Sequence, residues 1–465
     1  MQRRMPVLTA AACTSLLLTA VLPASSADAA SVAPGHYTGT IADGSTWIAD
    51  VPAHWNGSLI LFSHGFGPTT AADSPSAASQ TALLDQGYAL AGSSYDPSGS
   101  WWALDTAESD QFATLAAVEQ LLGGRPHRVI AMGESMGGLI NSQIAEDGNG
   151  RVDAALDMCG LVAGGVDLNN YQLNAEYAIT KLIPGASGVQ IRDYASPTDG
   201  TTAATALSNA ITAAQSTAAG KARIALVGAL LNETDWAAGE TAPAPHDYAG
   251  QEAQEEEWMT TGGQLAFIEF GRYYIEQAAG GDSGWNVGVN YAALLSRSTH
   301  SQQVAALYRA AGLNLRTDLA TLDRGESLAP ESGSLASMEH SSTNTGRITV
   351  PMLDIHTTSD QLVPVEQESA FAQKVEQAGS GALLRQAYVS RQGHCNFTTA
   401  ETVAALDTVN QRVTTGHWGD STSAASLQAA ADALGLDGAA YVSYRPGPLV
   451  TQDPNSLFAV RSSKG

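Results

Sequence analysis

Lysine is the scarcest charged residue in this sequence of 465 residues. It occurs four times, and lysine and arginine together number 22 against 46 aspartates and glutamates, which gives a formal net charge of −24 at pH 7. A surface with this balance repels phosphate backbones and anionic lipid headgroups, so a nucleic acid is not expected as a partner. We expect solubility outside the cell to be the main consequence of the acidic surface.

Cysteine is rarer still, with Cys13, Cys159 and Cys395. If Cys13 is lost with a leader peptide, the remaining two can form one intramolecular bridge in an oxidising compartment, and two free buried thiols are the alternative. The sequence has no paired C-x-x-C, no H-E-x-x-H and no Asp-rich calcium loop, and its paired glycines lack the lysine of a phosphate-binding loop. We therefore predict neither a metal nor a cofactor.

Long apolar runs are confined to the N-terminus. Arg3 and Arg4 precede an apolar stretch over 7–22, and Ala27-Asp28-Ala29 follows. This pattern predicts a signal peptide over residues 1–30, cleaved after Ala29 or Ala30, because the apolar stretch is shorter than the ~20 residues that cross a bilayer. A buried core helix is the alternative, and the paired arginines also suggest twin-arginine export, although ordinary export is favoured. We expect a secreted protein without stable membrane insertion, and its oligomeric state is left open.

Strands and helices alternate in two parts of the chain. A hairpin is predicted over 37–41 and 46–51, and short apolar runs typical of buried strands occupy 59–62, 88–93, 128–132, 152–158, 347–356 and 384–389. Helices are predicted between them, over 77–86, 105–122, 136–145, 366–378 and 399–412. This order predicts the α/β class, with a mostly parallel sheet covered by helices on both faces.

The segment 164–346 interrupts that order. It is rich in Ala, Thr and Gly and has a helical pattern without clear strands, so we expect a helical cap or lid inserted between two core pieces, 31–163 and 347–465. The run Glu255-Glu256-Glu257 within it is expected to form a solvated helix face. The tail from Trp418 onward is expected to be an extended strap on the surface.

The pentapeptide Gly133-Glu134-Ser135-Met136-Gly137 matches the pattern G-x-S-x-G. A predicted strand precedes it and a predicted helix follows, which is the context that places a serine on a sharp turn with its Oγ exposed at the edge of the sheet. The helix N-terminus behind the serine favours negative charge on a substrate oxygen. We predict that Ser135 is a nucleophile.

A serine nucleophile needs a base and a carboxylate that orients the base. On this architecture both follow the serine along the chain, on loops after later strands. Asp360 follows the strand predicted to end at His356, and His394 follows the last predicted long strand. We predict these two as acid and base; Asp354 lies within the strand and Glu366 opens the next helix, so both are weaker candidates.

Two backbone N–H groups are expected to bind the oxyanion of an acyl-transfer intermediate. Met136 directly follows the nucleophile and provides the first. The second is expected from the loop after residues 59–62, from Phe66 in the first place and Gly65 in the second. His64 is expected to brace this loop, and Trp101 and Trp102 are expected either to line the pocket or to pack in the core.

The glycine loop, the elbow at 133–137, Asp360 and His394 together resemble the α/β-hydrolase superfamily, over about residues 35–160 and 345–412. The resemblance implies hydrolysis of an ester or amide, and a lid inserted after the strand that follows the elbow. His394-Cys395 is also similar to the tannase and feruloyl-esterase group, in which cysteines beside the serine and the histidine are bridged. Here Glu134 precedes the serine, so the match is partial and Cys159 would be the partner of Cys395.

Three functions remain open from the sequence. The first is a secreted serine hydrolase that cleaves small-molecule or polymeric carboxylic esters through an acyl-enzyme. The second is a peptidase or amidase with the same three residues. The third, a binding protein with an inactive hydrolase fold, is disfavoured because Ser135, Asp360 and His394 are all present.

Overall fold

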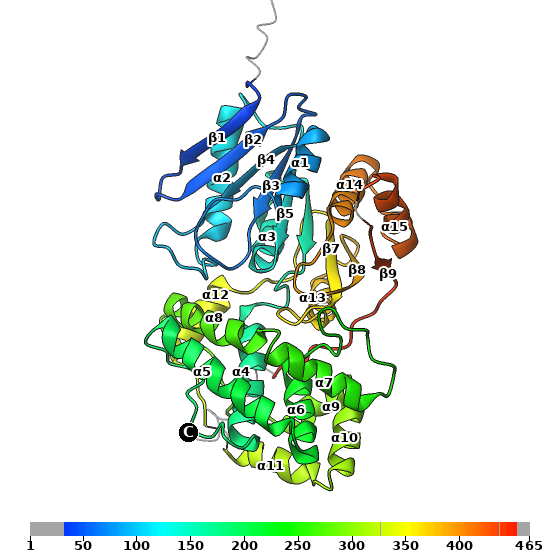
Figure 1. Cartoon of the computed structure of the whole chain (residues 1–465). Coiled ribbons are helices and arrows are strands. Elements are labelled where there is room, and N and C mark those ends of the chain that lie inside the picture. The colour runs from blue at the N-terminus through cyan, green and yellow to red at the C-terminus, as the bar shows by residue number, and fades with distance from the viewer. Residues whose placement is uncertain (1–31, 326, 437, 453–465) are drawn as a thin grey trace, which may run out of the picture. The chain divides into compact units, whose positions relative to one another are not determined.

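The computed structural model describes residues 32–325, 327–436 and 438–452, so the expected signal peptide lies outside the described residues. The described strands form one sheet with the order β1-β2-β4-β3-β5-β6-β7-β8-β9 (Figure 1). Their bounds are β1 Gly35–Thr40, β2 Thr46–Val51, β3 Ser58–Ser63, β4 Ala89–Ser93, β5 Arg128–Glu134, β6 Ala154–Met158, β7 Met352–Ser359, β8 Leu384–Gln392 and β9 Tyr441–Val442.

Strands β3 to β8 pair in parallel, and antiparallel pairs occur at the two edges of the sheet, where β1, β2 and β9 lie. Parallel neighbours require crossover connections, which the alternating helices supply. The predicted α/β class and mostly parallel sheet are therefore confirmed. The carboxyl ends of β5, β7 and β8 lie at one edge of the sheet, where the predicted site residues follow them.

Strand β3 shows why the sheet is covered on both faces. Leu59 and Leu61 belong to one buried apolar cluster, and Ile60 and Phe62 belong to a second. Because successive side chains of a strand point to opposite faces, an uninterrupted apolar run needs helices on both sides. Helices α2 (Ala107–Leu121), α3 (Met136–Asp147) and α13 (Glu366–Gln377) contribute to the first cluster, and α1 (Ala77–Asp85) and α14 (Thr399–Thr415) to the second.

The chain between β6 and β7 is helical, as expected. It contains α4 Gly165–Leu182, α5 Pro197–Ala214, α6 Ala218–Leu231, α7 Tyr248–Met259, α8 Gln264–Ala279, α9 Tyr291–Arg297, α10 Ser301–Ala310, α11 Leu315–Gly325 and α12 Ser332–Ser341. Its two ends meet, because the Gly165 amide donates to the Ser342 carbonyl oxygen over 2.7 Å. Helix α6 is apolar around most of its circumference, as is typical of a helix that neighbours surround. No described helix combines the length and apolar character needed to cross a membrane.

Three expectations require correction. The acidic run in α7 is not a solvated face, because Glu255 is fully buried and its carboxylate accepts from the His300 ring over 2.8 Å. The tail is not an extended strap throughout, because it forms helix α15 (Ala424–Ala433) and strand β9, and Trp418 is buried. Strand β7 begins five residues later than predicted, at Met352, and continues past His356 to Ser359.

Candidate active site

Ser135 lies on a sharp turn between β5 and α3. Its φ of 57° and ψ of −124° are a conformation that L-residues rarely adopt, which is the strain expected of a nucleophile elbow. The flanking glycines are required by close backbone contacts. A Cβ on Gly133 would lie 2.2 Å from the carbonyl oxygen of Gly137, and one on Gly137 would lie 2.0 Å from that of Ser63.

The structure brings Ser135, His394 and Asp360 together. The His394 Nε2 lies 2.7 Å from the Ser135 Oγ, and its Nδ1 lies 2.7 Å from the Asp360 Oδ2. Because a carboxylate only accepts hydrogen bonds, Nδ1 carries the proton, and Nε2 is left to accept from the serine hydroxyl. This arrangement can move a proton from the hydroxyl to the imidazole when the oxygen attacks a carbonyl carbon.

Asp360 is buried and is held by four donors. Its Oδ1 accepts from the backbone N–H groups of Leu362 and Val363 over 2.9 and 2.8 Å, and its Oδ2 faces the rings of His394 and His356. Burial alone would raise the pKa of Asp360, but the facing imidazoles lower it well below its usual range. This carboxyl group is therefore ionised at neutral pH.

The weaker candidates for the acid lie elsewhere. Asp354 is fully buried inside β7, and burial raises the pKa of its carboxyl group well above the usual range. Glu366 is the first residue of α13, and burial also raises its pKa. No hydrogen bond or ion pair of either carboxyl group with His394 is present among the described residues.

The glycine loop after β3 lies against the serine. A Cβ on Gly65 would be 3.1 Å from the Ser135 Cβ, so the backbone approaches the nucleophile closely at this point. The His64 Nδ1 lies 2.8 Å from the Gly65 carbonyl oxygen, and its ring stacks on Tyr95 with centroids 4.2 Å apart. Burial lowers the pKa of His64. These contacts fit a bracing role for His64, while the oxyanion contacts predicted for Met136, Phe66 and Gly65 stay predictions.

Cys159 and Cys395 form a disulfide with their Cα atoms 5.3 Å apart. Cys159 directly follows β6, and Cys395 directly follows His394. The bridge therefore attaches the histidine loop to the edge of the central sheet. The Cys395 Sγ also lies 3.4 Å from the His394 Nε2, and these two cysteines and His394 are the group of possible metal ligands found among the described residues. Because both sulfurs are bonded to each other, neither is available as a thiolate ligand.

A narrow apolar pocket of about 40 Å³ opens beside the Ser135 Oγ and the His394 ring. Its other lining residues are mainly apolar and come from the core and from the helical segment: Phe66, Trp102, Leu161, Leu168, Gln172, Phe267, Ile268, Gly271, Ile275, Leu362 and Val363. There is no Lys or Arg among these described residues. Of the two tryptophans considered from the sequence, Trp102 lines the pocket and Trp101 stacks on Tyr274 at 4.7 Å just outside it.

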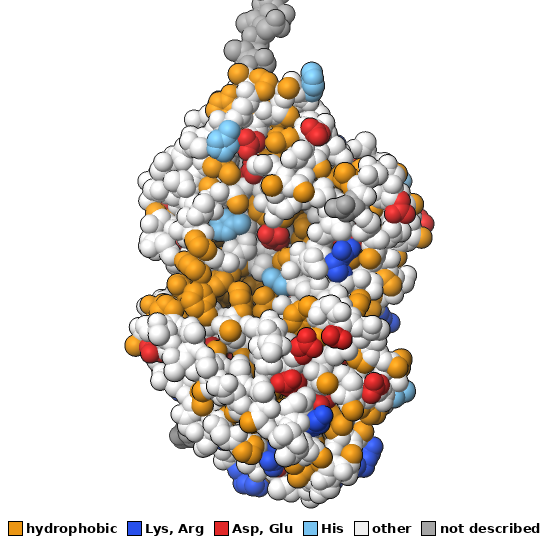
Figure 2. Space-filling view, in the orientation of Figure 1, with side chains coloured by type: hydrophobic (Ala, Val, Ile, Leu, Met, Phe, Trp, Pro, Cys, Tyr) orange, Lys and Arg blue, Asp and Glu red, His pale blue; other side chains and the backbone are white. Residues whose placement is uncertain are grey.

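Hydrophobic side chains gather in the hollow beside helix α8 (Figure 2). Phe66 packs edge-on against Trp101, Phe267 and Tyr274, with ring centroids 5.7 to 5.8 Å apart, and Phe270 packs against Trp101. Phe267 is 41% exposed. We call these five rings the aromatic strip; it continues the apolar pocket toward solvent.

A larger polar pocket of about 440 Å³ lies on the other side of Asp360. It is bordered by Glu233, Asp235, His300, Glu366 and Arg445 among others, and it shares no lining residue with the apolar pocket. Ser135 and His394 line the apolar pocket and not this one.

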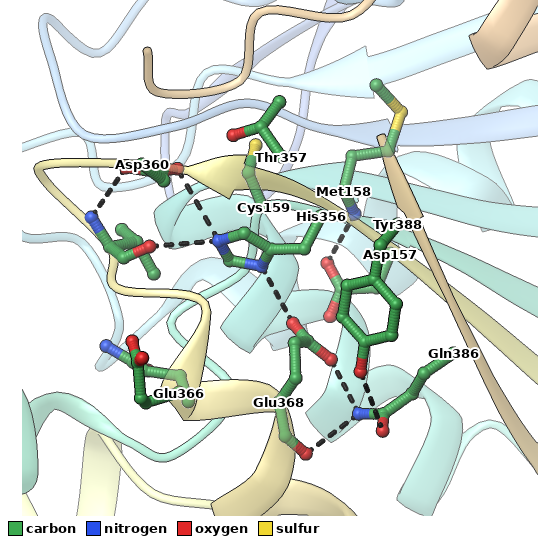
Figure 3. A network of polar contacts seen from close by, with 12 residues as sticks. Asp157, Met158, Cys159, His356, Thr357, Asp360, Glu366, Glu368, Gln386 and Tyr388 are labelled. Carbon is green, nitrogen blue, oxygen red and sulfur yellow. Dashed lines mark hydrogen bonds and ion pairs between the residues drawn. The ribbon is translucent and has the colours of Figure 1, made fainter. Parts of the chain in front are cut away.

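Two residues near the site were not identified as site residues from the sequence. The sequence pattern predicts His356 only as the end of a strand, yet its buried ring contacts Asp360 and Glu368 (Figure 3). A histidine within an apolar strand, four residues before the predicted acid, is the signal that could have revealed it. Glu134 was noted only because it replaces a cysteine, yet its carboxylate interacts electrostatically with His394, and burial raises its pKa to about 7.

No family model matches the chain. The chain is 30% identical over 418 residues to the o-phthalyl amidase of Xanthobacter agilis, which covers 85% of this chain and 90% of the amidase. Among solved structures, an acylaminoacyl peptidase is 12% identical and covers 78% of this chain but 37% of its own, with a TM-score of 0.35. An esterase from Aspergillus oryzae is 14% identical and covers 81% and 78%, with a TM-score of 0.37.

The fold is assigned from the strand order of the sheet and from the elbow at Ser135. The amidase matches along most of both chains. The chain therefore belongs to the α/β-hydrolase superfamily and, within it, to the hydrolase family of the o-phthalyl amidase.

Proposed function

We propose that this protein is a serine hydrolase that cleaves amides and esters of aromatic carboxylic acids through an acyl-enzyme at Ser135. The observation that carries the proposal is the 2.7 Å contact between the His394 Nε2 and the Ser135 Oγ at the base of an apolar pocket. A serine hydroxyl that donates to an imidazole, which in turn donates to a buried carboxylate, is the arrangement that activates serine.

In the first half of the reaction, the Ser135 Oγ attacks the substrate carbonyl carbon while His394 takes the hydroxyl proton. The carbonyl oxygen becomes an oxyanion, which the N–H of Met136 and an N–H of Phe66 or Gly65 would stabilise. His394 then donates its proton to the leaving nitrogen or oxygen, and the bond to the leaving group breaks. In the second half, water attacks the acyl-enzyme with His394 as base, and the free acid is released.

An aromatic acyl group fits the lining of the pocket. Phe66, Trp102 and Phe267 offer ring faces and edges, which stabilise a bound aromatic ring beyond simple burial. The related protein is named an o-phthalyl amidase. The o-phthalyl group is an aromatic acyl group with a second carboxyl group, which is anionic at neutral pH. Because the described lining of the pocket contains no Lys or Arg, we propose that the acyl group taken here is uncharged.

The likeness to an amidase supports an amine as the leaving group here, instead of the alcohol expected from the sequence. The same acyl-enzyme forms more easily from an ester, because an alcohol leaves without prior protonation of a basic nitrogen. We propose amide hydrolysis as the main activity because of the likeness to an amidase, and ester hydrolysis as an accompanying activity. The helical segment 164–346 would act as the cap, since six of its residues line the pocket: Leu168, Gln172, Phe267, Ile268, Gly271 and Ile275.

The test compares four substrates that differ in one group at a time: the p-nitroanilide and the p-nitrophenyl ester of benzoic acid, and the same two derivatives of acetic acid. We expect the benzoyl derivatives to exceed the acetyl derivatives in kcat/KM, by about 10- to 100-fold for the buried ring. The Ser135→Ala variant should lose on the order of 10³- to 10⁶-fold in kcat, and a fluorophosphonate should label Ser135 in the unchanged protein. Acetyl substrates that react as well as benzoyl ones would contradict the aromatic preference, and an unlabelled Ser135 would contradict the mechanism.

We also propose that the protein is exported. The basic start, the apolar stretch and Ala27-Asp28-Ala29 support a signal peptide, and a disulfide is compatible with an oxidising compartment. N-terminal sequencing of protein recovered from the medium of a secreting bacterial host should begin at Ala30 or Ser31. Protein that stays in the cell with Met1 intact would contradict export.

A further inference from the structure

A second histidine lies behind the predicted acid. The ring of His356, on β7, is fully buried, and each of its nitrogens faces an acceptor (Figure 3). The Nδ1 lies 2.8 Å from the Glu368 Oε1, and the Nε2 lies 2.9 Å from the Val363 carbonyl oxygen. The Val363 carbonyl oxygen can only accept, so the Nε2 carries a proton. Beside an ionised Glu368 the Nδ1 carries a proton as well, which makes the ring a cation.

Glu368 is fixed as the partner of this cation. Its Oε2 accepts from the Gln386 Nε2 over 2.6 Å, and the same amide nitrogen lies 2.8 Å from the Glu368 carbonyl oxygen. Both carboxylate oxygens of Glu368 are therefore occupied by donors, one from His356 and one from β8. A buried ion pair with hydrogen bonds on all sides is the kind that retains both charges.

The same ring contacts the predicted acid. The Nε2 of His356 is 3.5 Å from the Asp360 Oδ2, the oxygen that accepts from His394. The Val363 carbonyl that His356 binds belongs to the turn whose amide groups, at Leu362 and Val363, donate to the other oxygen of Asp360. His356 thus holds the acid and the turn that orients it.

We propose that His356 is a positioning residue for the Ser135–His394–Asp360 site. It is a permanent buried cation that fixes Asp360 and reduces the electrostatic stabilisation that the Asp360 carboxylate gives to protonated His394. This inference rests on the proposed function, because it concerns the base of that reaction. A positive charge behind Asp360 makes protonation of His394 less favourable. His394 therefore stays unprotonated, and able to act as a base, down to a lower pH.

The ionisable groups around the ring favour its cationic form. Asp360 and Glu368 raise the pKa of His356 to about 10, although burial alone would lower it. Asp157 on β6 and Asp354 on β7 lie in the same buried region, and burial raises the pKa of both carboxyl groups well above the usual range, which favours their neutral forms. The remaining groups are Glu366, whose pKa burial raises, and Tyr388, whose pKa burial also raises.

The first test is the pH profile of kcat/KM for His356→Gln, a neutral variant whose side-chain amide can still donate to Val363. Loss of the cation should move the acid limb to higher pH, by roughly one pH unit for charges several ångströms apart in a protein interior. A residue that only supports the fold would lower kcat and leave the limb unchanged. An unchanged limb in a folded His356→Gln protein would overturn the proposal.

His300→Gln is the matched control. His300 also pairs with a buried glutamate, Glu255, over 2.8 Å, and the pKa of His300 is raised to about 9. It lies in the helical segment, and no hydrogen bond or ion pair joins it to Asp360. The His300→Gln variant should keep the acid limb of the unchanged protein. If both variants move the limb equally, the effect is not specific to the position behind Asp360, and the proposal fails.

The second test does not depend on the folding of His356→Gln or on catalysis. In the full chain labelled with ¹⁵N-histidine, the ring of His356 should keep two protonated nitrogens at pH 8.5. The spectrum of His300→Gln lacks the ring signals of the other His–Glu pair, so it distinguishes those signals from the signals of His356. A His356 ring with one protonated nitrogen at that pH would overturn the proposal. If instead Ser135→Ala retains full activity, the proposed function fails, whatever the charge on His356.

Discussion

Glu134 is the ionisable residue next to the proposed nucleophile. Burial raises the pKa of its carboxyl group to about 7, while its interaction with His394 opposes that rise. Its anion therefore forms in the pH range in which enzymes with a histidine base lose activity toward acid. A nearby negative charge favours the protonated form of an imidazole, so Glu134 acts in the direction opposite to His356.

We predict that Glu134→Gln moves the acid limb of kcat/KM to lower pH, by about half a pH unit, because the neutral amide no longer stabilises protonated His394. The measurement is the same pH profile that is used for His356→Gln, so the two neutral variants should shift the limb in opposite directions. A shift to higher pH for Glu134→Gln would show that its carboxylate does not act on His394 through charge.

At the residue scale, the predicted triad was readable because each member follows a strand of the sheet in the expected order. Ser135 also had a local pattern of glycines around it. His356 was not readable in this way, because its role depends on which side chain of α13 reaches the ring, and Glu368 carries no signal in the sequence. Glu255 is a similar case, because a run of three acidic residues does not reveal that one of them meets the histidine at the N-cap of α10.

At the scale of elements, the disulfide joins β6 to the loop between β8 and α14 across 236 residues of chain. In the loop-entropy model, closing so long a loop stabilises the folded state by about 5 kcal/mol, and measured values are usually lower. The bridge also holds the backbone next to His394, so its loss affects both stability and the proposed base.

We predict that the double variant Cys159→Ala/Cys395→Ala loses about 2–5 kcal/mol of stability and shows a lower thermal midpoint and a lower kcat. The measurement is thermal unfolding with and without a reducing agent. The reductant should lower the midpoint of the unchanged protein toward that of the variant and leave the variant itself unaffected. Equal effects of the reductant on both proteins would mean that the bridge is not the source of the stability.

Helix α8 contributes three rings of the aromatic strip, Phe267, Phe270 and Tyr274. Phe267 lines the pocket and is 41% exposed, while Phe270 belongs to the part of the aromatic strip outside it. The pocket volume of about 40 Å³ is small beside a cavity of about 150 Å³ that holds benzene. A benzoyl group therefore requires side chains to move, and Phe267 is the most exposed aromatic residue that lines the pocket.

We predict that Phe267→Ala raises kcat/KM for naphthoyl relative to benzoyl substrates, on the order of tenfold, because the wider pocket accepts the second ring. Tyr444→Ala is the matched control, since Tyr444 is also 41% exposed and lines the larger polar pocket instead. An unchanged ratio for Phe267→Ala, or an equal change for Tyr444→Ala, would mean that Phe267 does not limit the size of the acyl group.

At the scale of the whole molecule, the alternation of strands and helices was sufficient to predict a parallel sheet and the helical nature of segment 164–346. The apolar run of β3 needs cover on both faces whatever the details of the helices. The tail was predicted poorly, because β9 has two residues and pairs with β8 only in the folded chain. The packing of α8 over the pocket likewise depends on contacts between distant segments, which periodicity within one segment does not encode.

The charge of the whole chain acts on the choice of substrate. With a formal net charge of −24, the molecule repels anions at long range, and the described lining of the apolar pocket offers no Lys or Arg to compensate. We predict that a benzoyl amide with a second carboxylate on the ring has a kcat/KM at least about tenfold lower than the neutral benzoyl amide at low salt.

Salt separates the two sources of this preference. Repulsion by distant surface charges is screened within about 8 Å at physiological ionic strength, so the ratio between neutral and anionic substrates should narrow as salt rises from 10 to 500 mM. The part that remains at high salt measures the cost of placing a carboxylate in a pocket without a cation, since buried charges are screened far less. If the anionic substrate is preferred at every salt concentration, a positive group outside the described lining must bind it, and the proposal of an uncharged acyl group is wrong.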